Sequence, residues 1–316
     1  MVNNLKTELP LTSRRQFIRS AALTGASFLA SHPVLFASEK PRSQKLVILH
    51  TNDVHSRLDP FADGQYAGKG GVAARAALVS RIRQEEGQVL LLDAGDIFQG
   101  TPYFNLYKGE PEIKAMSMMG YDAGTIGNHD FDAGIENLAT QVSTHAKFPI
   151  IICNYDFSGT PMEAHHRPYQ IFKKGDLKIG ITGVGIEMAG LVGQGLYGNT
   201  KYLDPVLRVN EISTYLKEKK NCDMVICLSH LGDRYKNEKI SDELLAQRSV
   251  NLDLVIGAHT HQFFEKPRQY SNSVNKQVIV NQVGWGGIQL GRIDYEFSNG
   301  KGKMGESTTP LLIEKN

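Results

Sequence analysis

Five short apolar segments of this sequence each run directly into Asp, His or Asn residues, and this repeated pattern restricts the fold more than any other feature. The segments KLVILH, QVLLLD, DAGTI, DMVICLS and LDLVIG occupy residues 45–50, 88–93, 122–126, 223–229 and 252–257. Segments with helical spacing of apolar residues lie between them, and this alternation indicates an α/β architecture. In such folds the loops beyond the carboxyl ends of several strands converge on one crevice. The sequence therefore predicts one site built by loops from five strands.

The other periodic segments predict the rest of this architecture. Further strands are expected at 148–153, 177–184, 276–283 and 288–297, and helices at 72–86, 134–146 and 206–220. Two glycine-rich stretches, 65–71 and 187–199, are expected to form mobile surface loops near an opening.

Seven polar side chains that follow the five strands are able to bind metal ions. They are Asp53, His55, Asp96, Asn128, His230, His259 and His261. Crowding so many carboxylates and imidazoles without a compensating cation would be costly, so a metal site is the simplest interpretation. Oxygen and nitrogen donors without a thiolate suit Mn, Fe, Zn or Co better than Cu(I), and the imidazoles argue against an all-oxygen Ca site. Seven ligands are enough for two ions bridged by one carboxylate. Two such ions, about 3.5–4 Å apart, lower the pKa of a bridging water and hold the oxygens of a phosphoryl group.

The motifs TNDVH, DAGDIFQG, TIGNHDFD, SHLG and GAHTH, in this order, resemble the metallophosphatase domain of the 5'-nucleotidase family within the calcineurin-like phosphoesterases. They span Thr51 to His261, and the later VGWGGIQLGRIDYEF is similar to the last strands of that domain. The resemblance implies a four-layer α/β/β/α sandwich of two mixed sheets flanked by helices, with a dimetal site at the strand carboxyl ends. It also implies hydrolysis of phosphate monoesters, such as 5'-nucleotides or related nucleotide and sugar phosphates, by attack of a metal-bridging hydroxide.

The resemblance further implies a role for each site residue. The first metal ion would be held by Asp53, His55 and His261, the second by Asn128, His230 and His259, and Asp96 would bridge both. His129 would face the substrate as the catalytic imidazole, oriented by Asp132. Many family members have Gln where this chain has His261, a change that can shift the metal preference. They usually have Glu in place of Asp130, which is interpreted as a structural residue.

The first 37 residues predict an export signal. The pair Arg14–Arg15 precedes an uncharged, mostly apolar run and then a polar exit, a pattern that resembles the twin-arginine type of bacterial signal. Cleavage is expected near Ala37, which leaves residues 38–316 as the metallophosphatase domain in the periplasm or otherwise exported. The apolar run is too short and interrupted to indicate a spanning helix. Folding before export would allow metal loading in the cytoplasm, which favours manganese, with iron, zinc or cobalt as alternatives.

Charge and cysteine content exclude two further classes of protein. The net charge is +2, and four basic residues and one acidic residue of the leader account for most of it, so the remainder is near −1. A general nucleic-acid binder would show a basic surplus. Cys153, Cys222 and Cys227 are odd in number and lie in or beside apolar runs. They are expected to be buried thiols rather than a disulfide framework or a metal site.

Substrate recognition is where the resemblance stops. The family has a second, C-terminal domain that contributes an aromatic clamp for the base and arginines for the phosphate, and this sequence, which ends at Asn316, is expected to lack it. A separate chain would then supply this surface, or the substrate would be another phosphoester. Two alternatives stay open: a thiosulfohydrolase like the related sulfur-oxidation enzyme, and a metal-binding subunit or binding module that depends on a partner. The His129–Asp132 pair argues against a purely structural module, because coordination alone does not require it.

The remaining polar residues receive structural interpretations. Asp93 is expected to shape the turn before Asp96 or to support the ligands, and His50 to be packed or hydrogen-bonded within its strand. Trp285 either lines the pocket or packs in a loop. No motif surrounds His145, His165 and His166.

Overall fold

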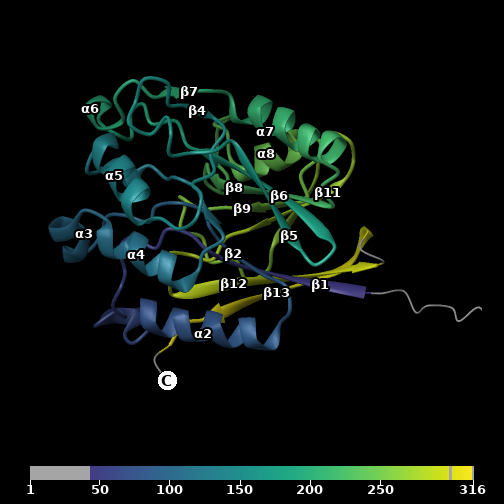
Figure 1. Cartoon of the computed structure of the whole chain (residues 1–316), viewed down its shortest axis with the longest axis horizontal. Helices are drawn as coiled ribbons and strands as arrows, with labels where there is room; N and C mark the ends of the chain where they lie inside the picture. The colour runs from purple at the N-terminus through teal and green to yellow at the C-terminus, as the bar shows by residue number, and fades with distance from the viewer. Residues whose placement is uncertain (1–42, 299–300, 315–316) are drawn as a thin grey trace, which may run out of the picture. The chain divides into compact units, whose positions relative to one another are not determined.

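Two mixed β-sheets packed face to face form the centre of the structure, and helices cover the outer face of each sheet (Figure 1). The computed structural model describes residues 43–298 and 301–314. The predicted export signal, residues 1–37, lies outside these described residues. Within them, no helix is long and apolar enough to cross a membrane.

The first sheet contains five strands in the order β13-β12-β1-β2-β3. Strands β1, β2 and β3 run parallel to one another, β12 pairs antiparallel with β1, and β13 pairs antiparallel with β12. Its strands are β1 (Ser43–Thr51), β2 (Val89–Asp93), β3 (Ala123–Gly124), β12 (Gln289–Ser298) and β13 (Lys301–Leu312).

The second sheet contains six strands in the order β10-β11-β9-β8-β6-β5, with a parallel centre and an antiparallel strand at each edge. Its strands are β5 (Tyr169–Lys174), β6 (Leu177–Gly185), β8 (Met224–His230), β9 (Leu254–Ile256), β10 (Arg268–Ser271) and β11 (Gln277–Asn281). The short strands β4 (Tyr155–Asp156) and β7 (Lys201–Tyr202) pair separately.

Helices on the first sheet's side include α2 (Val72–Glu85), α3 (Pro102–Tyr107), α4 (Glu110–Met119) and α5 (Ile135–His145). The second sheet is covered by α7 (Pro205–Thr214) and α8 (Asp242–Arg248). Asp204 caps α7 by accepting hydrogen bonds from the backbone N–H groups of Val206 and Leu207, and Pro205 occupies the first turn. The short turns are α6 (Gln194–Tyr197), η1 (Gly64–Tyr66), η2 (His129–Phe131) and the π-helical η3 (Tyr215–Lys219).

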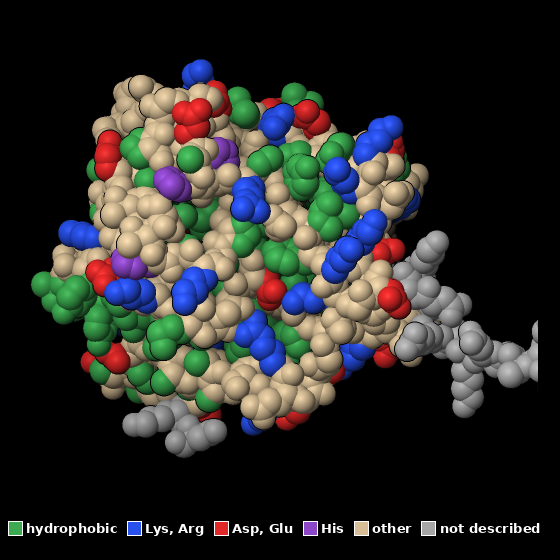
Figure 2. Space-filling model, viewed as in Figure 1, with side chains coloured by type: hydrophobic (Ala, Val, Ile, Leu, Met, Phe, Trp, Pro, Cys, Tyr) green, Lys and Arg blue, Asp and Glu red, His purple; other side chains and the backbone are tan. Residues whose placement is uncertain are grey.

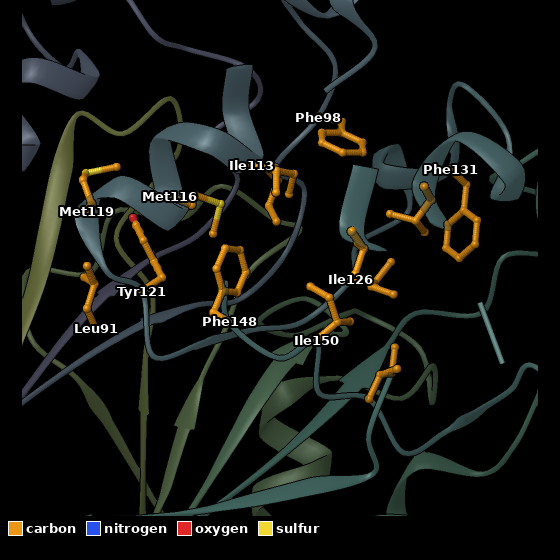
Figure 3. Packing of buried hydrophobic residues seen from close by; sticks show 14 of the residues in the cluster. Leu91, Phe98, Ile113, Met116, Met119, Tyr121, Ile126, Phe131, Phe148 and Ile150 are labelled. Atoms are coloured by element: carbon orange, nitrogen blue, oxygen red, sulfur yellow. The ribbon is translucent and has the colours of Figure 1, made fainter. Parts of the chain in front are cut away.

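Three apolar layers hold the four layers of secondary structure together. Alternation along β1 places Leu46 and Ile48 between the two sheets and Val47 and Leu49 against the helices of the first sheet. Figure 3 shows this helix-facing layer, in which Met116 and Met119 of α4 lie on the same side as Leu91 and Tyr121. A third cluster packs α7 and α8 onto the second sheet. The predicted α/β/β/α sandwich is therefore confirmed.

Most predicted elements are found, with three differences. Residues 148–153 form only isolated bridges, from Ile150 to Gly124 and from Ile151 to Arg167, because Pro149 cannot donate a ladder hydrogen bond. The helix predicted at 206–220 ends at Thr214 and continues as the π-helical η3. Several elements were not predicted from the sequence, namely helices α3, α4 and α8 and strands β4, β5, β7, β10 and β13. The three cysteines are buried free thiols, as predicted.

The surface carries charges of both signs. Figure 2 shows Lys and Arg side chains spread over one face with Asp and Glu among them. Exposed apolar side chains gather over α3, where Leu106 and Tyr107 are largely exposed. The face in view thus has no single-sign field of the kind that nucleic-acid binding requires.

Candidate metal centre

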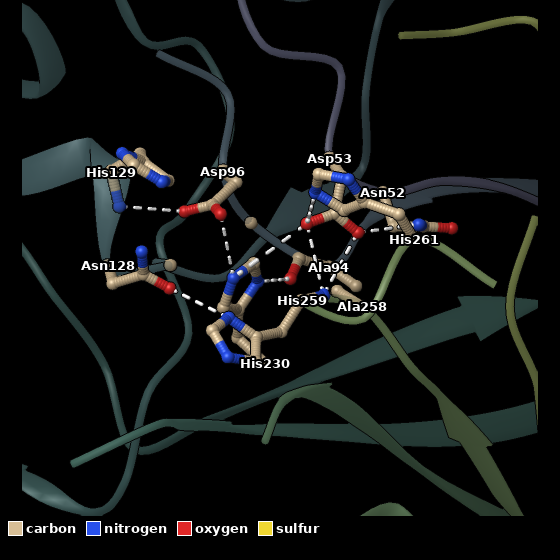
Figure 4. Close-up of polar contacts among 12 residues, drawn as sticks. Asn52, Asp53, Ala94, Asp96, Asn128, His129, His230, Ala258, His259 and His261 are labelled. Carbon is tan, nitrogen blue, oxygen red and sulfur yellow. Dashed lines mark hydrogen bonds and ion pairs between the residues drawn. The ribbon is translucent and has the colours of Figure 1, made fainter. Parts of the chain in front are cut away.

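All seven predicted metal-binding residues meet at the carboxyl ends of the strands (Figure 4). Three loops of the first sheet contribute the residues after β1, β2 and β3, and two strands of the second sheet contribute the rest. The loops place Asp53 and His55 after β1, Asp96 after β2, Asn128 after β3, His230 at the end of β8, and His259 and His261 after β9. Both sheets therefore build the site, which explains why its residues are so far apart in the sequence.

The side chains form two groups, each with ligand atoms within 4.8 Å of one another: Asp53, His55 and His261 in the first, and Asp96, His230 and His259 in the second. In the first group the Nε2 atoms of His55 and His261 are 3.0 Å apart, and His261 Nε2 lies 3.4 Å from Asp53 Oδ1. In the second, His230 Nε2 lies 3.0 Å from Asp96 Oδ2.

Asp96 lies between the two groups. Its Oδ2 atom is 3.0 Å from His230 Nε2 and 3.8 Å from His55 Nε2. Asn128 adjoins the second group, where its Oδ1 atom is 2.9 Å from His259 Nδ1. One carboxylate thus faces imidazoles from both groups, which is the arrangement that a bridging ligand requires.

The donor atoms of the site fit cations rather than each other. His230 Nδ1 is 2.8 Å from the carbonyl oxygen of Ala94 and therefore carries the hydrogen, which leaves Nε2 as a lone-pair donor. This Nε2 atom is buried and lies 3.0 Å from Asp96 Oδ2, without a well-aligned hydrogen bond to any described residue. Two acceptors in contact need a positive charge between them. His55 Nδ1 lies 3.3 Å from the carbonyl oxygen of Phe98, so its Nε2 atom likewise presents a lone pair toward His261.

Electrostatics favour positive charge at this position. Burial alone would lower the pKa of His230, but the carboxylates of Asp96 and Asp53 outweigh it and raise that pKa to about 10, so Nε2 holds a proton unless a bound metal ion replaces it. Burial, together with the neighbouring His230, lowers the pKa of His259 to about 4, so this imidazole is neutral, as a metal ligand must be.

The loops reach this arrangement through an unusual backbone. Five of the seven residues adopt left-handed conformations, with φ between 49° and 69°: Asp53, His55, Asp96, His259 and His261. Such conformations are costly for residues other than glycine and persist where the surroundings enforce them. Here the loops hold one another, because the backbone N–H of Asp53 donates to Gly95 O at 2.9 Å and that of His259 to the Asp53 carboxylate at 3.0 Å.

Gly127 is required by the close approach of two of these loops. A Cβ atom at this position would lie 2.1 Å from Asp96 Oδ1 and 2.6 Å from His230 Cε1. The start of the GNHDFD turn is therefore in contact with both the proposed bridging carboxylate and a buried imidazole, and any side chain would displace them.

Asp130 ties the GNHDFD turn to the loop after β2. Its carboxylate is 1% exposed and accepts four backbone hydrogen bonds. Oδ2 accepts from Gly127 at 2.8 Å and Asp96 at 3.0 Å, and Oδ1 accepts from Ile97 at 2.9 Å and Phe98 at 3.0 Å. The structural interpretation of Asp130 thus agrees with its contacts: it fixes the backbones that carry Asp96 and Asn128.

His129 and Asp132 stand at the open side of the site. His129 Nδ1 is 2.8 Å from Asp132 Oδ2, and the two side chains are 38% and 31% exposed, whereas Asp53, Asp96 and His230 are buried. The hydrogen bond to Asp132 raises the pKa of His129. The backbone N–H of His129 also donates to Asp96 Oδ1 at 2.8 Å. Because Nδ1 is occupied by Asp132, Nε2 is the nitrogen left for a substrate.

The sequence analysis missed Asn52, which positions Asp53. Its side-chain amide donates to Asp53 Oδ2 at 2.7 Å and to Gly284 O at 2.6 Å, and its oxygen accepts from the backbone of Val283 at 3.0 Å. The only signal was an Asn directly before the ligand in TNDVH, which is too weak to distinguish it from an ordinary turn residue.

Other polar residues near the site have structural contacts. Asp93 accepts from Thr51 Oγ1 at 2.6 Å and from the backbone of Gly95 at 2.9 Å, so it shapes the turn before Asp96. His50 is fully buried, and its Nε2 accepts from Asn281 Nδ2 at 2.9 Å.

Trp285 lies beside the first group of ligands. Its ring stacks on His261 at a centroid distance of 5.9 Å and also contacts Phe61 edge-on at 5.3 Å, so it both packs in its loop and borders the site. None of the other histidines within residues 43–298 belongs to the site: His165 and His166 border a hollow beside α5, and His145 ends that helix.

Comparisons with known proteins agree with this geometry. The sequence model of the calcineurin-like phosphoesterase family matches residues 46–263. A 5'-nucleotidase of Vibrio cholerae is 34% identical over 291 residues, which cover 84% of this chain and 51% of the relative. The crystal structure of a 5'-nucleotidase precursor from Thermus thermophilus superposes with a TM-score of 0.77 at 29% identity, covering 86% of this chain and 55% of that one.

A sulfate thiohydrolase of Thermus thermophilus shares the fold alone, with a TM-score of 0.70 at 17% identity and coverage of 87% of this chain and 58% of that one. The chain spans about half the length of the curated relatives it matches.

Proposed function

Because the chain belongs to the calcineurin-like phosphoesterase family, we propose that it is a metal-dependent phosphoesterase that hydrolyses phosphate monoesters, with 5'-nucleotides or related nucleotide and sugar phosphates as substrates. The observation that carries the proposal is the pair of ligand groups joined at Asp96, with His129 and Asp132 at their open side. The 5'-nucleotidases among its relatives support the substrate class.

The chain offers a ligand set for two divalent ions. Asp53, His55 and His261 would hold the first, Asn128, His230 and His259 the second, and Asp96 would contact both. Two divalent ions in such a site supply Lewis acidity and make water a stronger nucleophile at neutral pH. Oxygen and imidazole donors suit manganese, which we propose as the natural metal, with zinc, iron and cobalt as alternatives.

The exposed pair acts on the substrate. Asp132 holds Nδ1 of His129 and thereby fixes the ring, so that Nε2 is available to contact the phosphoryl group or to protonate the leaving oxygen. The Asp96 carboxylate contributes to the same positioning because it accepts a hydrogen bond from the His129 backbone. A module that only stored metal would need neither side chain of the pair.

We also propose that the protein is exported by the twin-arginine route and acts in the periplasm. The proposal has two forms. In the first, this domain alone recognises the nucleotide base, and in the second, a separate partner chain does so. Only a similarity in fold supports the thiosulfohydrolase alternative, and no feature of the site favours it. Hydrolysis of phosphate esters is therefore the stronger conclusion.

Phosphate release by the purified protein tests the proposal. After removal of metals with EDTA, addition of Mn²⁺ is expected to restore release from AMP and from 4-nitrophenyl phosphate. The His129→Ala variant is expected to bind Mn²⁺ like the wild type but to lose most of its turnover. Unchanged turnover of this variant would remove His129 from the mechanism, and activity on the aryl ester alone would favour the form with a partner chain.

A further inference from the structure

A cavity of about 630 Å³ opens beside the proposed catalytic pair and is not used by the metal ligands. Residues from the turn after β2, from α3, from α6 and from the GNHDFD turn line it, and Figure 1 shows α3 and α6 on the side to which β1 runs. Its lining includes Gln99, Thr101, Phe104, Asn105, Lys108 and Asp132. Because the cavity shares Asp132 with the proposed catalytic pair, it is a candidate place for the leaving group of a substrate whose phosphate contacts His129.

Two walls of this cavity are continuous with the metal centre. Asp132 is one wall, and its Oδ2 atom is bound to His129 Nδ1. The opposite wall, Gln99 to Thr101, packs on the backbone of His55: a Cβ atom on Gly100 would lie 3.0 Å from the His55 carbonyl oxygen. Thr101 Oγ1 also donates to Ser56 O at 3.0 Å. A group bound in the cavity is thus held at a fixed place relative to the site.

Three polar side chains of the cavity are available to a ligand. The side-chain amides of Gln99 and Asn105 make no hydrogen bond with any described residue, and Lys108 Nζ has no carboxylate partner among them and lies 5.8 Å from the centroid of the Phe104 ring. The position of Lys108 is nevertheless fixed, since it ends α3 in a left-handed conformation and its carbonyl accepts from Asn137 Nδ2 at 2.8 Å. Buried Phe104 and half-buried Leu196 add an apolar surface.

We propose that this cavity binds the sugar of the leaving group, so that the preferred substrates are esters in which the phosphate is attached to a hydroxylated ring. Amides, an amine and a carboxylate donate to and accept from ring hydroxyl groups, and the apolar surface packs against the C–H face of the ring. Binding energy from this remote part of the substrate then supports hydrolysis at the phosphate. The inference rests on the proposed phosphoesterase function and specifies its substrate class.

Two esters that differ only in their hydroxyl groups test this inference with the full-length, Mn²⁺-loaded protein. 1,4-Anhydroribitol 5-phosphate, the sugar ester, carries two ring hydroxyls, and tetrahydrofurfuryl phosphate has the same ring without them. The wild type is expected to prefer the sugar ester. In Asn105→Ala and Lys108→Met, the ratio of kcat/KM for the sugar ester to that for the bare-ring ester is expected to fall by about five- to tenfold, the worth of one lost hydrogen bond.

Lys114→Met is the matched control, because Lys114 lies on α4 outside the cavity and pairs with Glu110. It should leave the ratio unchanged. An equal loss on both esters, or no loss on either, would overturn the cavity assignment. If the wild type hydrolyses neither ester, the proposed function fails, and saturation-transfer NMR then decides the cavity separately. The cavity assignment is supported if ring protons of the sugar ester receive saturation in the wild type but not in Asn105→Ala. No difference between the wild type and this variant overturns the assignment.

Discussion

Replacement of Asp130 by Asn is expected to destabilise the protein strongly although it changes only one atom. The carboxylate accepts four backbone hydrogen bonds, two on each oxygen. An Asn side chain has one acceptor oxygen, so in either orientation its NH₂ group faces two backbone N–H donors. Each buried donor left without an acceptor costs about 1–3 kcal/mol. The expected loss in the free energy of unfolding is therefore about 2–6 kcal/mol, a large share of the total stability of an ordinary domain.

Urea unfolding followed by the fluorescence of Trp285, the single tryptophan, measures this loss. The experiment is best done in EDTA, so that metal binding does not contribute to stability. Burial, together with the nearby charge of Asp96, raises the pKa of Asp130 to about 7, so a buffer at pH 8 keeps the carboxylate ionised.

Asp132→Asn is the contrasting variant, because its partly exposed hydrogen bond is expected to contribute less than about 1 kcal/mol to stability. It should lose turnover and keep its stability. An Asp130→Asn variant within 1 kcal/mol of the wild type, or an Asp132→Asn variant as unstable as Asp130→Asn, would refute the interpretation that Asp130 holds the two loops together.

Two further predictions follow from buried contacts. Gly127→Ala is expected to lower Mn²⁺ affinity, measured by calorimetry, by more than about tenfold, because the added Cβ would displace Asp96 and His230. Gly87→Ala is the control, since a Cβ at that position meets no neighbour, and it should leave Mn²⁺ affinity unchanged. Equal affinities in the two variants would contradict the contact of Gly127 with Asp96 and His230. Burial lowers the pKa of His50 to about 3. Between about pH 6.5 and pH 3 the unfolded chain therefore binds a proton that the folded chain does not. The free energy of unfolding falls as the pH falls, by up to about 1.4 kcal/mol per pH unit. His50→Gln should remove this part of the slope between pH 7 and pH 4.5, and identical slopes would show that His50 is protonated in the folded state.

The positions of the candidate ligands were predictable from the sequence because each follows an apolar strand. Parallel strands bring their carboxyl ends to one edge, so the order of Asp53, Asp96 and Asn128 along the chain was enough to place them together. His230 and His259 could be predicted as ligands without knowing that their strands belong to a second sheet.

What the sequence did not reveal depends on contacts that side chains make with the backbone of other segments. The four hydrogen bonds of Asp130 and the positioning of Asp53 by Asn52 involve N–H and C=O groups, which look alike at every position of a sequence. Helices α3 and α4 were missed because they are short and separated by a turn at Gly109 followed by Pro111. The cavity beside Asp132 was equally hidden, since its walls come from segments without a shared motif.

Metal stoichiometry tests the central claim most directly. Elemental analysis of the purified protein, after saturation with Mn²⁺ and exhaustive dialysis, should give two ions per chain for the wild type. Asp96→Ala, which removes the carboxylate between the two groups, should retain less than one. Less than one ion per chain in the wild type, or two ions in the Asp96→Ala variant, would contradict a dimetal centre joined at this residue.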